Sequence, residues 1–122
     1  MAFGTSIDTT TKFLRVGNLI ASLLETDRYE EAATFAREWV HQAKRELGEK
    51  SEIYRKIRWG IMHSLEANPR ASRDDIIEAV AMWDEEVRRA RRTYGPSHPW
   101  TVRLESDFTR VRSKLASFNA ES

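Results

Sequence analysis

The fold is decided by the stretch Asn18-Leu-Ile-Ala-Ser-Leu-Leu-Glu-Thr-Asp-Arg-Tyr-Glu-Glu-Ala32. An apolar segment, a short polar segment and a new apolar start follow one another, which is typical of two helices joined by a tight turn. From Lys12 onward, apolar residues recur at intervals of three and four, which predicts an amphipathic first helix that ends near Thr26. Asp27 and Glu30 have the spacing of a capping box, so we expect the second helix to begin there.

Four breaks separate the helices that the sequence predicts. They lie near residues 26–28, 48–51, 67–72 and 95–99. Gly48 and Gly95 are suited to end helices as left-handed caps, because glycine has no Cβ to clash in that conformation. Pro69 cannot continue a helix, since it lacks a backbone N–H. The chain is therefore predicted to be all-α, with five antiparallel helices.

The later helices also have recognisable starts. Ser72 and Asp75 form a second capping pair, and Pro99 is suited to the first turn of the last helix. The predicted organisation is an N-terminal tail (1–11), a helical repeat domain (12–118) and a C-terminal tail (119–122).

The chain contains an internal repeat built from pairs of helices. An offset of 47 residues pairs Gly48 with Gly95, Ala32 with Ala79, Val40 with Val87, and Ala43 with Ala90. Two columns of apolar residues in the first helices of the units are predicted to be buried in one layer: Val16, Ile57 and Leu104, then Ile20, Ile61 and Phe108. Such a period indicates hairpins that stack into an α-solenoid, each covering the apolar face of its neighbour.

Three segments carry a resemblance to a known family. They are Asp27-Arg-Tyr-Glu-Glu-Ala32, Leu47-Gly48 and Gly95-Pro-Ser-His98-Pro99-Trp-Thr101. They resemble the "GRYEEA", "LG" and "GxxHPxT" segments of tetratricopeptide repeats of the kinesin light chain type, and the resemblance covers residues 12–115. It implies a short α-solenoid of two and a half repeats that binds other proteins. It also implies that the first helix of each unit lines a concave face, where asparagines such as Asn18 contact the backbone of a bound peptide.

A row of basic and polar side chains lies opposite the core stripe of those first helices. Its predicted members, in three aligned columns, are Arg15, Lys56 and Arg103; Asn18, Trp59 and Ser106; and Ser22, His63 and Arg110. Cations, an aromatic ring and hydrogen-bonding groups could hold an acidic or extended segment of a partner protein by charge-assisted hydrogen bonds and aromatic packing. The alternative is an ordinary solvated face that contains one tryptophan.

Other classes of function find less support in the sequence. The densest basic run is Arg88, Arg89, Arg91 and Arg92. Asp84 and Glu85 stand four residues before the first two arginines and can pair with them, so nucleic-acid binding is not expected. Glu38 and His41 have the Glu-x-x-His spacing of bundle metal sites, but no second copy exists, so no metal site is expected. Without a glycine-rich phosphate loop or a Ser/His/Asp set, we expect no enzyme, no cofactor and no small-molecule substrate.

The composition indicates a folded domain and is compatible with a reducing compartment. The 122 residues are 40% apolar, and a net charge of +1 gives no overall attraction to nucleic acid or to an anionic membrane. The absence of cysteine excludes disulfides and thiolate sites. No apolar run is long enough to span a membrane, so we expect no membrane insertion. The predicted protein is intracellular, cytoplasmic by default, or in an organelle after removal of a targeting segment.

Two functions fit these patterns. The first is an adaptor or scaffold whose concave face binds a segment of a partner, and the second is a constitutive subunit of a larger complex. The last helix bears on the second function, because its apolar stripe is longer than one neighbouring hairpin covers: Leu104, Phe108, Val111, Leu115 and Phe118. Self-association, a partner helix or a larger assembly is expected to cover the rest of that stripe.

Overall fold

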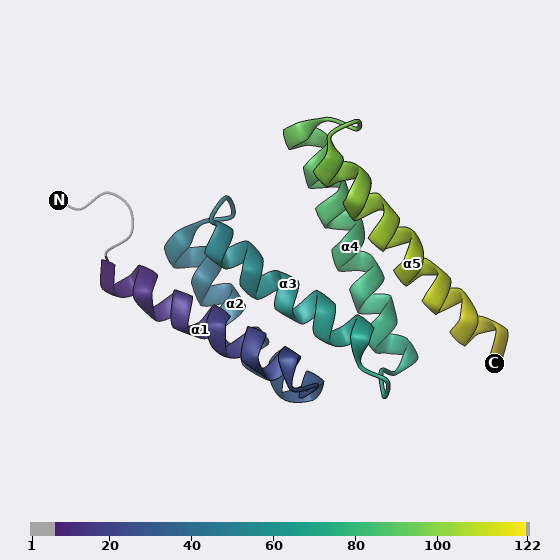
Figure 1. The fold of residues 1–122 in the computed structure, drawn as a ribbon, viewed down its shortest axis with the longest axis horizontal. Helices are drawn as coiled ribbons and strands as arrows, with labels where there is room; N and C mark the ends of the chain where they lie inside the picture. Colours follow the sequence, from purple (N-terminus) through teal and green to yellow (C-terminus); the bar gives the residue numbers. More distant parts are fainter. Residues whose placement is uncertain (1–6, 122) are drawn as a thin grey trace. The chain divides into compact units, whose positions relative to one another are not determined.

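The fold is all-α in a computed structural model that describes residues 7–121 (Figure 1). These residues form five α-helices and no strand: α1 (Ile7–Glu25), α2 (Tyr29–Leu47), α3 (Glu52–Ala67), α4 (Arg73–Tyr94) and α5 (Pro99–Glu121). The predicted all-α class and the predicted number of helices are confirmed. All four breaks lie within a residue or two of their predicted places, which is the usual precision of helix ends.

The helices form two compact units, Met1–Asn68 with α1 to α3 and Pro69–Ser122 with α4 and α5. The boundary falls at Pro69, inside the third predicted break, where the chain cannot continue a helix. Within each unit, consecutive helices run antiparallel (Figure 1), as expected for helices joined by short connections.

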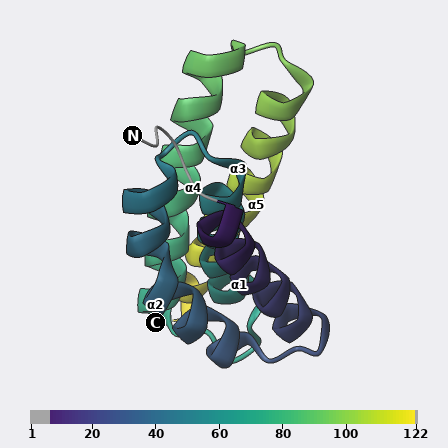
Figure 2. The same cartoon turned by 90° about the vertical axis from the view of Figure 1, so that its left-hand side faces the viewer.

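The core of the first unit lies between α1, α2 and α3, each of which packs against the other two (Figure 2). Its buried apolar side chains are Phe13, Val16, Ile20 and Leu23 from α1, Ala32, Ala36, Val40 and Ala43 from α2, and Tyr54, Ile57, Ile61, Met62 and Leu65 from α3. The small alanines of α2 let its backbone approach the larger side chains of its neighbours. At one edge, the rings of Phe13 and Trp39 meet edge to face, with centroids 6.0 Å apart.

α1 and α3 approach each other closely at Gly60. A Cβ built on Gly60 would lie 2.5 Å from Cγ2 of Ile20, a methyl group on a β-branched side chain that is itself buried. Such a side chain is stiff at χ1 and cannot turn away easily. Glycine is therefore needed here for close packing of two helices, and not for an unusual backbone conformation.

The second unit is a hairpin of α4 and α5. Its buried side chains are Ile76, Ala79, Trp83, Val87 and Ala90 from α4, and Thr101, Leu104 and Val111 from α5. Polar contacts join the two helices near both ends: Arg91 Nε donates to Glu105 Oε1 at 2.7 Å, and Arg73 Nε donates to Asn119 Oδ1 at 2.8 Å. The register of the hairpin is therefore held by the apolar stripe and by contacts at both ends.

The internal repeat predicted from the sequence has a structural counterpart. Gly48 and Gly95 follow α2 and α4 with φ angles of 88° and 90° and ψ angles of 160° and 161°. Their N–H groups donate to the carbonyl oxygens of Lys44 and Arg91, which are also 47 residues apart. The paired positions on the two helices are all buried: Ala32 and Ala79, Val40 and Val87, Ala43 and Ala90. The positive φ agrees with the predicted glycine ends, although the ψ angles are extended and not those of a left-handed helix.

The start of α2 differs from the prediction. The helix begins at Tyr29, and its N-cap residue Arg28 makes no side-chain capping hydrogen bond, so the predicted box of Asp27 and Glu30 is wrong. Asp27 has a φ of 58° and belongs to the turn that ends α1. Its carboxylate accepts a hydrogen bond from the hydroxyl of Tyr29 at 2.9 Å. The aspartate thus stabilises the left-handed turn, a conformation that Asp tolerates better than most residues.

The other predicted helix starts are confirmed. Ser72 and Asp75 form a complete capping box, with hydrogen bonds of 3.1 and 3.0 Å. Pro99 is the first residue of α5, and the Nδ1 atom of His98 accepts a hydrogen bond from the N–H of Trp100 at 3.0 Å. His98 therefore caps a free N–H at the start of the last helix.

Three further predictions need correction. The first helix begins at Ile7, five residues before Lys12, and its exposed first residues include Asp8, whose charge suits a helix N-terminus. The last helix continues beyond Phe118 to Glu121. Phe108 is half-buried and not buried, because a helix that packs on only one neighbour leaves part of its apolar stripe uncovered. Residues 1–6 of the predicted N-terminal tail lie outside the described residues.

Candidate functional site

The α1–α3 surface comprises the predicted site residues that lie on the first unit: Arg15, Asn18 and Ser22 of α1, with Lys56, Trp59 and His63 of α3. All are exposed except Trp59, which is half-buried. A Cβ at Gly17 would lie 3.7 Å from Cδ of Lys56, so the aliphatic part of that lysine rests against α1 beside Asn18. Long basic side chains often cover apolar surface in this way while the charge stays in water.

The two cations of this surface are not neutralised by acids of the described chain. Arg15 and Lys56 form no ion pair with any carboxylate among residues 7–120. Trp59 and His63 each have a contact within the protein, and Trp59 keeps part of its ring accessible. The surface therefore offers positive charge beside an aromatic ring, a combination that suits acidic groups.

The remaining predicted site residues lie on the second unit. Arg103, Ser106 and Arg110 are all exposed on α5. Arg110 pairs with Asp107 of the same helix at 3.6 Å. Burial, and secondarily the charge of Arg110, lower the pKa of Lys114 below its ordinary value. The predicted set is thus divided, because only the residues of α1 and α3 are brought together on neighbouring helices of one unit.

A second surface, the α1–α2 groove, was not predicted from the sequence. It has a volume of about 510 Å³ and is lined by Leu19, Leu23, Arg28, Glu30, Glu31, Thr34, Phe35 and Glu38. Leu19 is 46% exposed because its position on α1 lies off the core stripe. A large apolar residue displaced from the stripe, opposite a helix rich in glutamate, was the signal in the sequence that could have indicated this groove.

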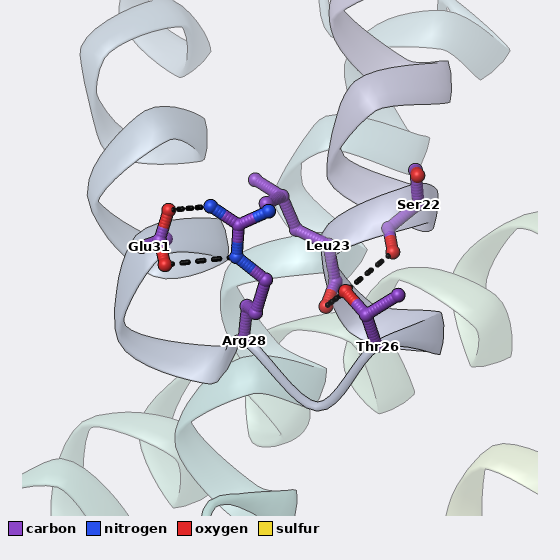
Figure 3. A network of polar contacts seen from close by, with 5 residues as sticks. All are labelled: Ser22, Leu23, Thr26, Arg28 and Glu31. Atoms are coloured by element: carbon purple, nitrogen blue, oxygen red, sulfur yellow. Dashed lines mark hydrogen bonds and ion pairs between the residues drawn. The ribbon is translucent and has the colours of Figure 1, made fainter.

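The turn at one end of the groove is held by a network of polar contacts (Figure 3). The hydroxyl of Thr26 donates to the carbonyl oxygens of Ser22 and Leu23, both at 3.1 Å. Arg28 Nε donates to Glu31 Oε1 at 2.9 Å, and a second nitrogen of the guanidinium pairs with the other carboxylate oxygen. This hydrogen bond lowers the pKa of Glu31 below its ordinary value, so Glu31 stays charged and offsets Arg28.

Two carboxylates of the groove are left without a cation. Glu30 and Glu38 are exposed and form no ion pair within residues 7–120. Since Arg28 is already paired with Glu31, the rim carries net negative charge above an apolar floor of Leu19, Leu23 and Phe35.

Lys56 and the groove lie on different sides of α1. Gly17, which faces Lys56, and Leu19, which lines the groove, are two residues apart, or about 200° around the helix. Arg15 stands four residues before Leu19 and shares its face of the helix.

The remaining candidate residues have simpler surroundings. Arg88 pairs with Asp84 at 3.0 Å, as predicted, and Arg91 pairs with Glu105 on the neighbouring helix. Half of the basic run on α4 is thus offset by local acids, which weakens its attraction for phosphates. Within the described part of the chain, no group of three or more His, Asp or Glu side chains is placed to hold a metal ion.

Comparisons of the chain with protein-family models, with curated proteins and with solved structures found no match. Among residues 7–121, no helix combines the length and the apolar character needed to cross a bilayer. The candidate sites are therefore the α1–α3 surface and the α1–α2 groove.

Proposed function

We propose that this chain is a protein–protein interaction module whose α1–α3 surface binds an acidic or extended segment of a partner protein. The observation that carries the proposal is the pair of exposed cations, Arg15 and Lys56, which have no carboxylate partner among the described residues. Folding alone does not require unpaired like charges on neighbouring helices, because they repel one another. Carboxylates of a bound segment would offset these charges.

Each residue of the surface has a role in this proposal. Arg15 and Lys56 donate charge-assisted hydrogen bonds to carboxylates. The accessible part of the Trp59 ring packs against an apolar side chain or a peptide plane, and aromatic rings of this kind supply much of the binding energy at interfaces. Asn18 donates to and accepts from the peptide backbone.

The resemblance to tetratricopeptide repeats favours the same function. We extend the proposal to a repeat of the kinesin light chain type, in which α1 with α2, and α3 with α4, correspond to successive repeats along the sequence. The matching ends of α2 and α4 at Gly48 and Gly95 support an equivalence of these two helices. Stacked hairpins of this class present extended surfaces for partner segments.

A constitutive subunit of a larger complex is the second candidate, and α5 favours it. Trp100 and Val102 are 42% and 52% exposed, and three further apolar residues of the same helix are half-buried: Phe108, Leu115 and Phe118. Apolar area of this kind is usual where another chain packs. Size-exclusion chromatography of the native material separates the two functions, because a stable free monomer indicates an adaptor and exclusive elution with a large complex indicates a subunit.

Charge reversal at Lys56 tests the proposed surface. We expect Lys56→Glu to slow association with the partner protein and to weaken binding more at low salt than at moderate salt, since exposed charges are screened by ions. Trp59→Ala should mainly speed dissociation, by about tenfold, as for a packed aromatic anchor. Both rates are measured by surface plasmon resonance with the purified partner.

The matched control is Arg92→Glu, a charge reversal on the exposed side of α4. It should leave both rates unchanged. If the Lys56 and Trp59 variants bind like the wild type while Arg92→Glu abolishes binding, the partner binds α4 and the proposed surface is wrong.

A further inference from the structure

We propose that the α1–α2 groove is a second docking site, which takes an amphipathic helix of a partner protein with an apolar face flanked by lysine or arginine. The site lies outside the α1–α3 surface and does not depend on its function. The inference follows from the apolar floor of the groove, from the charges on its rim and from the position of both on one helical hairpin.

The floor of the groove is apolar and accessible. Leu19 is 46% exposed on α1, and Phe35 is half-buried on α2. Leu23 of α1 is buried and also lines the groove, so both helices contribute apolar side chains to it. Such a strip between antiparallel helices accommodates the apolar ridge of a third helix, with anchors spaced by three and four residues.

The rim selects the charge of the occupant. Glu30 and Glu38 lie two helical turns apart on α2, since each turn takes about 3.6 residues, and neither has a cation among the described residues. Lysine or arginine on either side of an apolar face would meet these carboxylates. An acidic segment or a phosphate backbone would be repelled, so nucleic acid and acidic helices are excluded from this site.

The turn next to the groove limits how the site can adapt. The pair of Arg28 and Glu31 and the hydrogen bonds of Thr26 fix the connection between α1 and α2 (Figure 3). Binding to a groove that is already formed costs less conformational entropy than binding to a groove that must first be ordered.

The test uses the full chain and synthetic fluorescent peptides in a fluorescence anisotropy titration. The probe is an amphipathic peptide of about four helical turns with a leucine face flanked by lysines. One comparison peptide has the same composition in scrambled order, and another has glutamate in place of lysine. The amphipathic lysine peptide should bind at least about tenfold more tightly than either comparison peptide.

Two pairs of variants locate the binding. Leu19→Ala should weaken binding of the lysine peptide about fivefold. Leu14→Ala, at a leucine of nearly equal exposure (45%) outside the groove, should leave this binding unchanged. The double variant Glu30→Gln and Glu38→Gln should weaken binding of the lysine peptide about tenfold and reduce the salt dependence of that binding. Removing the same charge with Glu49→Gln and Glu52→Gln, outside the groove, should have no effect. Lys56→Glu should also leave this binding intact, which separates the groove from the α1–α3 surface.

Four outcomes would overturn the proposal. Equal binding of the scrambled peptide would show attraction by charge alone. Equal effects of the Leu14 and Leu19 variants would show that the peptide does not bind in the groove. No binding of the lysine peptide at all would show the same. A concentration-dependent dimer in sedimentation equilibrium that is lost in Leu19→Ala would show that the occupant is a second copy of this chain.

Discussion

Trp83→Ala is expected to lower the free energy of unfolding of the second unit by about 3–5 kcal/mol, the usual cost of removing a buried tryptophan from a core. Trp83 is 1% exposed and is the largest fully buried side chain among the described residues. The unit has only two helices, so few other side chains can close around the cavity. Urea unfolding followed by circular dichroism measures the change, since fluorescence would be altered by loss of the tryptophan itself.

The control for this prediction is Trp100→Ala, because Trp100 is 42% exposed at the start of α5. Its loss should cost less than about 1 kcal/mol, as is usual for exposed positions. If the two tryptophan variants have the same urea midpoint, Trp83 is not part of a packed core.

Gly60→Ala is expected to lower the free energy of unfolding of the first unit by about 1–3 kcal/mol, because the new methyl group overpacks the contact with Ile20. Alanine is the better helix former by about 1 kcal/mol, so the steric cost must exceed that gain for the protein to be destabilised. The measurement is the urea midpoint of the variant compared with wild type.

Gly17→Ala is the matched control on the facing helix. A Cβ at Gly17 would be 3.7 Å from Cδ of Lys56, an ordinary van der Waals distance to a flexible side chain. This variant should be as stable as wild type or more stable by up to about 1 kcal/mol. Equal stabilisation by both alanines would show that α1 and α3 are further apart at Gly60 than the structure places them.

Much of the fold could be predicted from the sequence because helix periodicity and helix ends are local signals. The intervals of the apolar residues located all five helices. Gly48 and Gly95 correctly marked the ends of α2 and α4, and Pro99 correctly marked the start of α5. The capping box at Asp27 failed although its spacing was right. A turn with positive φ at Asp27 competes for the same aspartate, and spacing alone does not distinguish the two arrangements.

The less predictable features depend on which elements lie beside one another. Phe108 belongs to the apolar stripe of α5, but its burial requires a neighbour that the hairpin of α4 and α5 does not supply. The α1–α2 groove arises because Leu19 is brought beside Phe35 and Glu38 by the packing of two helices. The position of Leu19 off the core stripe is visible in the sequence, but the residues that face it depend on how α2 packs against α1.

The most direct measurement of the proposed function is an NMR titration of the ¹⁵N-labelled full chain with an extended synthetic peptide in which glutamate alternates with apolar residues. We expect chemical-shift changes concentrated on the α1–α3 surface, at Asn18, Lys56 and the indole N–H of Trp59, and none with the peptide in which glutamine replaces glutamate. Changes concentrated on α4 around Arg88 and Arg92, or no changes at all with the acidic peptide, would contradict it.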